Sequence, residues 1–289
     1  MEQLKLLLLL AIMSTTVYSQ TGVSGFMKPK GEKSFSVSFT SENYDDVFLA
    51  PSEINGVPVF NEVSRNSYNF YADAGLTDRL MLSVNLPYIN SEGEATSAVL
   101  EENGYENQRE NLQDLSLNIK YLVKSFDLSN SNLNLMANLG FATPLSDYKV
   151  DESFQSIIGI GNQSTRFNGI GIAQYKLDSG FFATGQLGYS ARTEDVPDAV
   201  LSQFKLGYAG SKFYGDVSIG SQRSTSGVDI IGEGFENFPE TRVSYTKIGI
   251  SLFAPLSGNL GLSAGASQLI DGLNIGKIAT IFGGITYSL

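Results

Sequence analysis

Apolar and polar residues alternate with a period of two along most of this chain. In residues 33–40 phenylalanine and valine alternate with serine, and in 80–86 leucine and valine alternate with Met81, Ser83 and Asn85. Successive side chains of a β-strand point to opposite faces, so this pattern predicts strands. We expect the remaining strands at residues 67–75, 114–123, 133–141, 167–175, 181–189, 204–208, 213–219, 243–252, 260–266 and 279–289.

Three places depart from simple alternation. Ile170 and Ile172 lie on the face opposite the other apolar residues of their strand. The apolar parity slips after Tyr245, which a β-bulge would explain. Pro87 has no N–H for a sheet ladder and is expected to end its strand.

The connections between these strands alternate strictly in length. Short turns are expected at residues 76–79, 127–130, 178–180, 209–211 and 255–259. Longer polar segments occupy residues 41–66, 89–111, 143–165, 192–199 and 223–241. Short periplasmic turns and long extracellular loops are typical of outer-membrane β-barrels. We therefore predict an all-β, antiparallel transmembrane barrel of about twelve strands, with both termini on the periplasmic side.

A soluble β-sandwich also alternates polar and apolar residues and is the main alternative. Strands of roughly nine to eleven residues match a tilted membrane crossing and exceed the usual length in soluble sheets. Aromatic residues often end the apolar face and would form two interfacial girdles. These aromatics are Tyr68, Tyr88, Tyr121, Phe141, Tyr175, Phe181, Tyr189, Tyr208, Phe213, Tyr245 and Tyr287. The girdles and the strand lengths favour the barrel, with outer-membrane lipid as its surroundings.

The final strand carries Ile281, Ile285, Tyr287 and Leu289 on one face. Barrel proteins commonly end in such an aromatic-bearing strand, which the barrel-assembly machinery recognises. Leu289 stands where a terminal Phe is more usual. We expect the assembly machinery to be a partner through this strand.

The N-terminus has the features of a secretory signal peptide. Lys5 precedes the apolar run 6–12, and Val17 and Ser19 suit a signal-peptidase site. A membrane anchor is the alternative, but the run is too short to span a bilayer of roughly 30 Å. We expect residues 1–19 to be cleaved and residues 20–289 to form the barrel domain.

Composition excludes several kinds of chemistry. The chain has no His and no Cys, which removes Ser-His-Asp triads and makes zinc or copper sites improbable. Its mean hydropathy of −0.03 is too polar for a helical membrane protein. The net charge of −11 argues against nucleic acid as a partner. Carboxylate pairs such as Asp45–Asp46 lie in expected loops and are interpreted as solvated charge. We expect neither an enzyme nor a cofactor.

Residues 70–80, FYADAGLTDRL, continue to NLPY at 85–88 and resemble the signature of the phenol-degradation meta-pathway (MetA-type) outer-membrane barrels. Residues 140–148, GFATPLSDY, resemble that family's strand end and Pro-containing loop, and NIGK at 274–277 is also similar. The resemblance implies a transporter for hydrophobic or aromatic small molecules, loosely like the fatty-acid and toluene channels. Only residues 20–32 precede the first strand, so the long N-terminal plug of the fatty-acid channels is not expected.

Polar residues on the inward parity are the candidate site residues, expected to line the lumen. They are Asp73, Asn85, Asp114, Asn118, Lys120, Asn134, Asn138, Gln174, Gln186, Gln203, Lys205, Tyr214 and Asp216. These side chains either fill the lumen as a hydrogen-bonded plug or line a water-filled path. The leading hypothesis is passage of an unknown small-molecule solute. The second is a structural or surface-interaction barrel whose long loops bind a partner, and an outer-membrane enzyme is a distant third.

Overall fold

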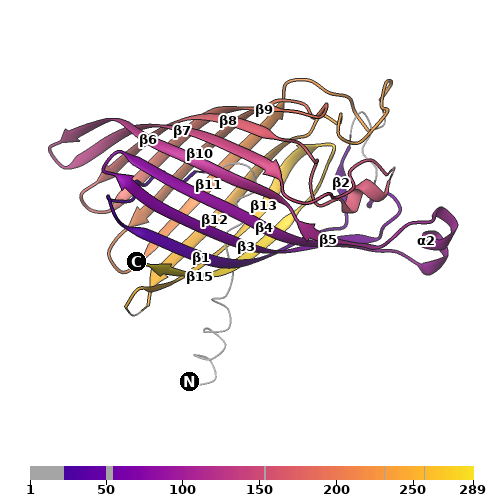
Figure 1. Ribbon diagram of the computed structural model, residues 1–289, viewed down its shortest axis with the longest axis horizontal. Coiled ribbons are helices and arrows are strands. Elements are labelled where there is room, and N and C mark those ends of the chain that lie inside the picture. The colour runs from indigo at the N-terminus through magenta and orange to yellow at the C-terminus, as the bar shows by residue number, and fades with distance from the viewer. Residues whose placement is uncertain (1–22, 50–54, 153, 231, 257) are drawn as a thin grey trace, which may run out of the picture.

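Long antiparallel strands wrap around a central axis until the first strands meet the last (Figure 1). The computed structural model describes residues 23–49, 55–152, 154–230, 232–256 and 258–289. The predicted signal peptide, residues 1–19, lies outside them. The wall strands are β1 (Lys33–Tyr44), β3 (Glu62–Thr77), β4 (Leu80–Glu94), β5 (Gln108–Leu112), β6 (Asp114–Leu128), β7 (Ser131–Pro144), β8 (Arg166–Leu177), β9 (Phe181–Arg192), β10 (Ala199–Ala209), β11 (Tyr214–Ser224), β12 (Ser244–Pro255), β13 (Leu260–Leu273) and β15 (Ala279–Ser288).

The sheet closes because β3 pairs with β1 on one side and with β4 on the other, while β1 pairs with β15. β5 and β6 both pair with β4 and are separated only by Gln113, so together they form one wall strand. The wall therefore has twelve strands in sequence order, as the alternation predicted. Short turns join the strands at one end and long loops at the other (Figure 1).

The long loops carry the small elements. β2 (Val47–Phe48) pairs with β14 (Ile275–Gly276), which ties the first long loop to the last. The α-helix α2 (Ser97–Asn103) lies in the loop between β4 and β5. The 3-10 helix η1 (Gln155–Ile158) lies in the loop between β7 and β8. Within the described ranges, no helix has the length and apolar character needed to cross a membrane.

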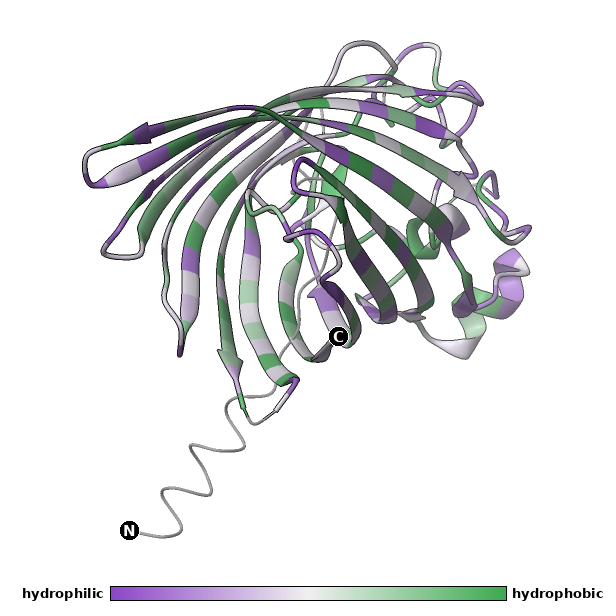
Figure 2. Ribbon diagram, turned by 60° about the vertical axis from the view of Figure 1, so that its left-hand side comes forward, coloured by the Kyte–Doolittle hydropathy of each residue, from purple (hydrophilic) through white to green (hydrophobic). Residues whose placement is uncertain are grey.

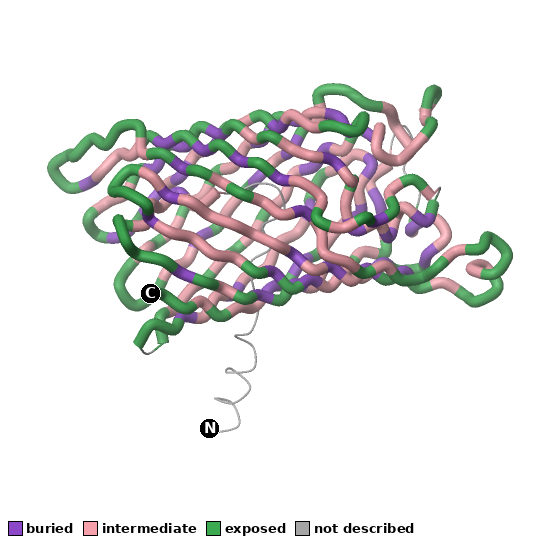
Figure 3. The backbone as a smooth tube through the Cα atoms, in the orientation of Figure 1, coloured by how far each residue is buried: buried purple, intermediate pink, exposed green. Residues whose placement is uncertain are grey.

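The two faces of the wall differ in chemistry. Bands of apolar and polar residues alternate along the strands in Figure 2, and exposed and buried positions alternate in Figure 3. On the outside, Leu139 is 70% exposed and Leu187 is 65% exposed. On the inside, Asn138 and Gln174 are buried. Exposed leucines beside buried amides are the reverse of a soluble protein and fit a wall surrounded by lipid.

The strands extend further toward the loop side than the alternation predicted. β4 continues through Pro87 to Glu94, so the expectation that Pro87 ends the strand is wrong. Pro87 lies where the neighbouring strand is interrupted at Gln113, and its carbonyl accepts a hydrogen bond from the Gln113 N–H at 2.9 Å. The proline N–H that is missing therefore falls at an irregularity, where a proline is tolerated.

The irregularity expected after Tyr245 is confirmed. The pairing of β12 with β13 shifts register between Thr246 and Lys247. The extra residue is Ile270 of β13, so β12 keeps its alternation and Tyr245 lies on the same inward face as Lys247; it is 5% exposed. The expectation that Tyr245 belongs to an aromatic girdle is therefore wrong. The other expected girdle residues are not buried; Tyr68 and Phe181, for example, are 50% and 59% exposed.

Because β7 faces lipid, an arginine should destabilise the protein more in the middle of this strand than just beyond its end. Leu139 lies mid-strand between Ile119 and Gly169, whereas Leu145 lies one residue beyond the strand and is also exposed. An arginine at the bilayer midplane costs about 2–4 kcal/mol, falling to about 0–1 kcal/mol near the interface. We expect L139R to lower the free energy of unfolding by the larger amount and L145R by the smaller. Denaturant titration in lipid vesicles measures both, and equal losses would contradict the membrane placement.

Candidate functional site in the barrel lumen

A cavity of about 470 Å³ occupies the loop-side half of the lumen. Val23 and Ser24 line it at one end, and the loop residues Phe238 and Pro239 line it at the other. Its wall combines polar groups of the strands, such as Asn85 and Asn118, with apolar groups of the loops. The volume is in the range of small-molecule sites in proteins.

Residues 23–28 lie inside the barrel and close the periplasmic side of this cavity. The Lys120 ammonium donates to the carbonyl oxygens of Ser24 at 2.6 Å and Phe26 at 2.5 Å. The Gln186 amide donates to the Val23 carbonyl at 2.7 Å. These bonds join wall side chains to backbone acceptors, so they hold the segment in place without adding it to the sheet.

Apolar and ionic contacts hold the same segment. Val23 and Met27 pack against the buried cluster of Met136, Ile170 and Ile172. The Phe26 ring meets the edges of Phe182 and Tyr214, with centroids 5.1 and 5.9 Å away. The Lys28 ammonium pairs with Asp73 at 2.9 Å.

Gly25 is the point of closest approach between the segment and the wall. A Cβ atom at this position would lie 2.8 Å from the Thr184 side chain. While Thr184 is present, only glycine fits here without displacing wall side chains.

The segment obstructs the lumen in a way that was not predicted, and it explains one departure from the strand pattern. No long plug was expected from residues 20–32, and residues 23–28 form a short segment that obstructs the lumen through contacts with inward side chains. The isoleucines Ile170 and Ile172 face inward, where apolar residues were not expected. They do so because they contact Val23 and Met27.

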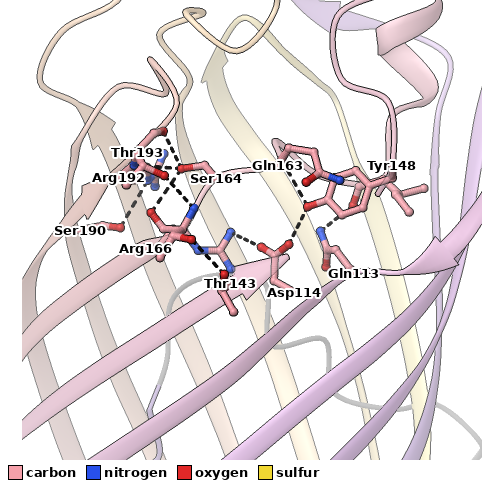
Figure 4. A network of polar contacts seen from close by, with 12 residues as sticks. Gln113, Asp114, Thr143, Tyr148, Gln163, Ser164, Arg166, Ser190, Arg192 and Thr193 are labelled. Atoms are coloured by element: carbon pink, nitrogen blue, oxygen red, sulfur yellow. Dashed lines mark hydrogen bonds and ion pairs between the residues drawn. The ribbon is translucent and has the colours of Figure 1, made fainter. Parts of the chain in front are cut away.

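A polar network closes the cavity at the loop side (Figure 4). Asp114, which is 2% exposed, accepts a hydrogen bond from the Tyr148 hydroxyl at 2.6 Å and pairs with Arg166 at 3.0 Å. Burial, together with the adjacent Asp114 carboxylate, raises the pKa of Tyr148 well above its usual range. Tyr148 therefore stays a neutral donor.

The loop of residues 145–165 is further tied across the barrel mouth. The Gln113 amide donates to the Ile160 carbonyl at 2.6 Å, and the Gln163 amide donates to the Ser146 carbonyl at 2.8 Å. Figure 4 shows Gln113, Tyr148 and Gln163 close together at the loop-side ends of the strands. The loop thus forms a roof held by hydrogen bonds.

Ion pairs fix the remaining loops. Arg242 pairs with Asp229 at 2.6 Å, and the Asn274 amide donates to the same carboxylate at 2.9 Å. The hydrogen bond from Arg242 lowers the pKa of Asp229. Lys277 pairs with Asp46 at 2.5 Å and its hydrogen bond lowers the pKa of Asp46. Both carboxylates stay ionised at neutral pH, which keeps these loops pinned near the mouth.

Strand alternation places all thirteen candidate residues on the inward side of the wall. Asn85, Asp114, Asn118 and Lys120 line the cavity. The candidates that contact residues 23–28 are Asp73, Lys120, Gln174, Gln186 and Tyr214. Asn134, Asn138, Gln203, Lys205 and Asp216 complete the inward set. That these residues guide a solute stays a prediction.

Sequence reasoning missed the charged residues at the strand ends. Glu42, Arg65, Arg166 and Arg192 line the cavity, and Lys247 faces inward below it. Three of these, Glu42, Arg65 and Arg192, fell in segments expected to be loops. Extending the period-two parity beyond the apolar runs would have found them, because the strands continue past the lipid-facing region.

Comparison with known proteins extends these observations. The family model described as "Putative MetA-pathway of phenol degradation" matches residues 55–273. An outer membrane channel from Pseudomonas putida F1 superposes with a TM-score of 0.69 at 11% identity, over 95% of this chain and 100% of that one. The beta domain of the Bordetella autotransporter BrkA gives a TM-score of 0.49 at 13% identity, over 89% and 99%. A search of curated proteins finds no match.

The first of these structures shows that the fold is an outer-membrane barrel. The apolar outer face agrees with it. Together they place this chain in the outer membrane.

The roof contacts predict how the loop responds to losing one hydroxyl. Y148F removes the donor to Asp114 and leaves that buried carboxylate with one fewer partner, which costs about 1–3 kcal/mol. We expect faster amide hydrogen exchange across residues 145–165, measured by mass spectrometry. Y105F is the control, because Tyr105 lies in a neighbouring loop. Unchanged exchange in Y148F would show that the network does not hold the roof.

Proposed function

We propose a function from the premise that this chain belongs to the family described as "Putative MetA-pathway of phenol degradation". The barrel is a channel that passes small molecules across the outer membrane, and their class is hydrophobic or aromatic. The family description supports the substrate class, and the lumen supports passage. The protein acts by positioning and selection, with no chemical step.

The observation that carries this proposal is the cavity together with the way in which it is closed. Its periplasmic end is formed by residues 23–28, which are hydrogen bonded to wall side chains rather than paired with a strand. Such a segment can move without breaking the sheet. A lumen filled by wall side chains alone would offer no such route.

Export and assembly complete the proposal. Cleavage before Gln20 would leave a new N-terminus three residues before Val23 in the sequence. Recognition of β15 by the barrel-assembly machinery would follow from its position as the last strand. Its outward face carries Ile281, Ile285 and Tyr287, each at least 44% exposed.

Weakening the segment should open the channel. K120M removes the donor to two backbone carbonyls and leaves the wall pairing intact. We expect a several-fold increase in planar-bilayer conductance and in the swelling rate of liposomes in isosmotic arabinose. K124M removes a charge from an exposed position of the same strand and should change neither.

Absence of conductance and swelling in both the unmodified protein and K120M would contradict a channel. The remaining function would then be binding of a partner through the long loops.

A further inference from the structure

The inner wall is cationic although the chain as a whole is acidic. The chain has a net charge of −11. Among the described strand residues, eight cations lie on the inward parity: Arg65, Arg109, Lys120, Arg166, Lys176, Arg192, Lys205 and Lys247. Five carboxylates share that face: Glu42, Asp73, Asp114, Asp127 and Asp216. The acidic residues therefore gather mainly outside the lumen.

Most of the inner carboxylates are already engaged. Asp73 pairs with Lys28 of the N-terminal segment at 2.9 Å, and Asp114 pairs with Arg166 at 3.0 Å. Glu42 lies 3.8 Å from Arg65. Asp216 accepts a hydrogen bond from the Tyr214 hydroxyl at 2.6 Å. Positive charge is left over after these pairings.

Lys205 and Lys247 hold part of that excess. In the described part of the chain, neither ammonium group has a hydrogen bond or an ion pair. The Asp216 carboxylate attracts the Lys205 ammonium through space. Glu42 attracts Lys247 in the same way, whereas Lys205 repels it. Two half-buried ammonium groups without a bonded partner on one wall are costly unless another anion visits them.

The strand register places these lysines next to the cavity. Leu201, Gln222 and Tyr245 line the cavity on β10, β11 and β12. One inward position toward the periplasm, Gly220 of β11 pairs with Lys247. One position further, Ser218 pairs with Lys205. On β11 the neighbours of both lysines are therefore small, whereas Leu269 of β13 pairs with Lys247 on its other side.

The cavity itself combines charge and apolar surface. The Arg192 guanidinium donates to the Gln222 amide oxygen at 2.9 Å and to the Pro197 carbonyl at 3.3 Å. Val196, Leu201 and Ile278 line the same cavity. A ligand that suits it has an anionic head and an apolar body.

We propose that the lumen selects small organic anions, with a carboxylate attached to a body the size of an aromatic ring. The carboxylate passes from Arg192 to Lys247 and Lys205 while the apolar body contacts the cavity wall. Coulomb attraction is stronger in this partly dehydrated lumen than in water, and lysine and arginine rings are used by anion pores. This inference rests on the proposed function and narrows its substrate class.

Binding in detergent tests the inference without requiring flux. Isothermal titration compares benzoate with its neutral isostere benzamide on the full chain. We expect benzoate to bind about tenfold more tightly, because a charge-assisted hydrogen bond is stronger than a neutral one. The double variant K205Q/K247Q should lose most of that preference. The control K33Q/K124Q makes the same charge change at exposed positions and should keep it.

Ion selectivity gives a second readout. The reversal potential in a KCl gradient should show preference for chloride, and this preference should fall in K205Q/K247Q alone. Equal binding of benzoate and benzamide by the unmodified protein would overturn the inference, even if neutral solutes cross. If the protein prefers benzoate but passes no solute, the proposed channel function is contradicted while the proposed anion site is supported.

Discussion

Closure of the sheet is the constraint on which the rest of this structure depends. Hydrocarbon offers no partner for a backbone N–H or C=O group, so a membrane-spanning sheet must leave no open edge. Here β3 pairs on both sides and β1 meets β15, which removes the edges. Once closed, the wall has only two faces. The outer face must be apolar, and the polar side chains must turn inward.

The inward polar groups then require partners of their own. Residues 23–28 supply some of these partners, since backbone carbonyls of the segment accept hydrogen bonds from Lys120 and Gln186. The loop roof supplies another through Tyr148, which binds Asp114 together with Arg166 of the wall. The cavity is the space left between these two sets of contacts. The cavity is therefore both closed and polar for one reason, which is that the inward polar groups bind residues 23–28 and the loop roof.

Much of the wall could be predicted from the sequence, because alternation is local and strong in strands such as β3 and β7. The roles of other residues depend on contacts distant in the chain. The Val23 carbonyl accepts a hydrogen bond from Gln186, which lies 163 positions away in the sequence. Residues 23–28 contain no sequence pattern that predicts a segment inside the lumen. Glu42, Arg65 and Arg192 were read as loop residues because the apolar run ends before the strand does. Tyr245 was misplaced because its aromatic ring was expected to face lipid, whereas it lies on the inward face, paired with the buried Gln222.

The central claim is that residues 23–28 obstruct a passage through the barrel. The chain has no cysteine, so the pair Gly25→Cys and Thr184→Cys can be joined without interference. The account predicts that this disulfide forms in the folded barrel, that it abolishes solute flux into liposomes, and that reduction restores the flux. Failure of the disulfide to form, or flux that is the same in the oxidised and reduced states, would contradict it.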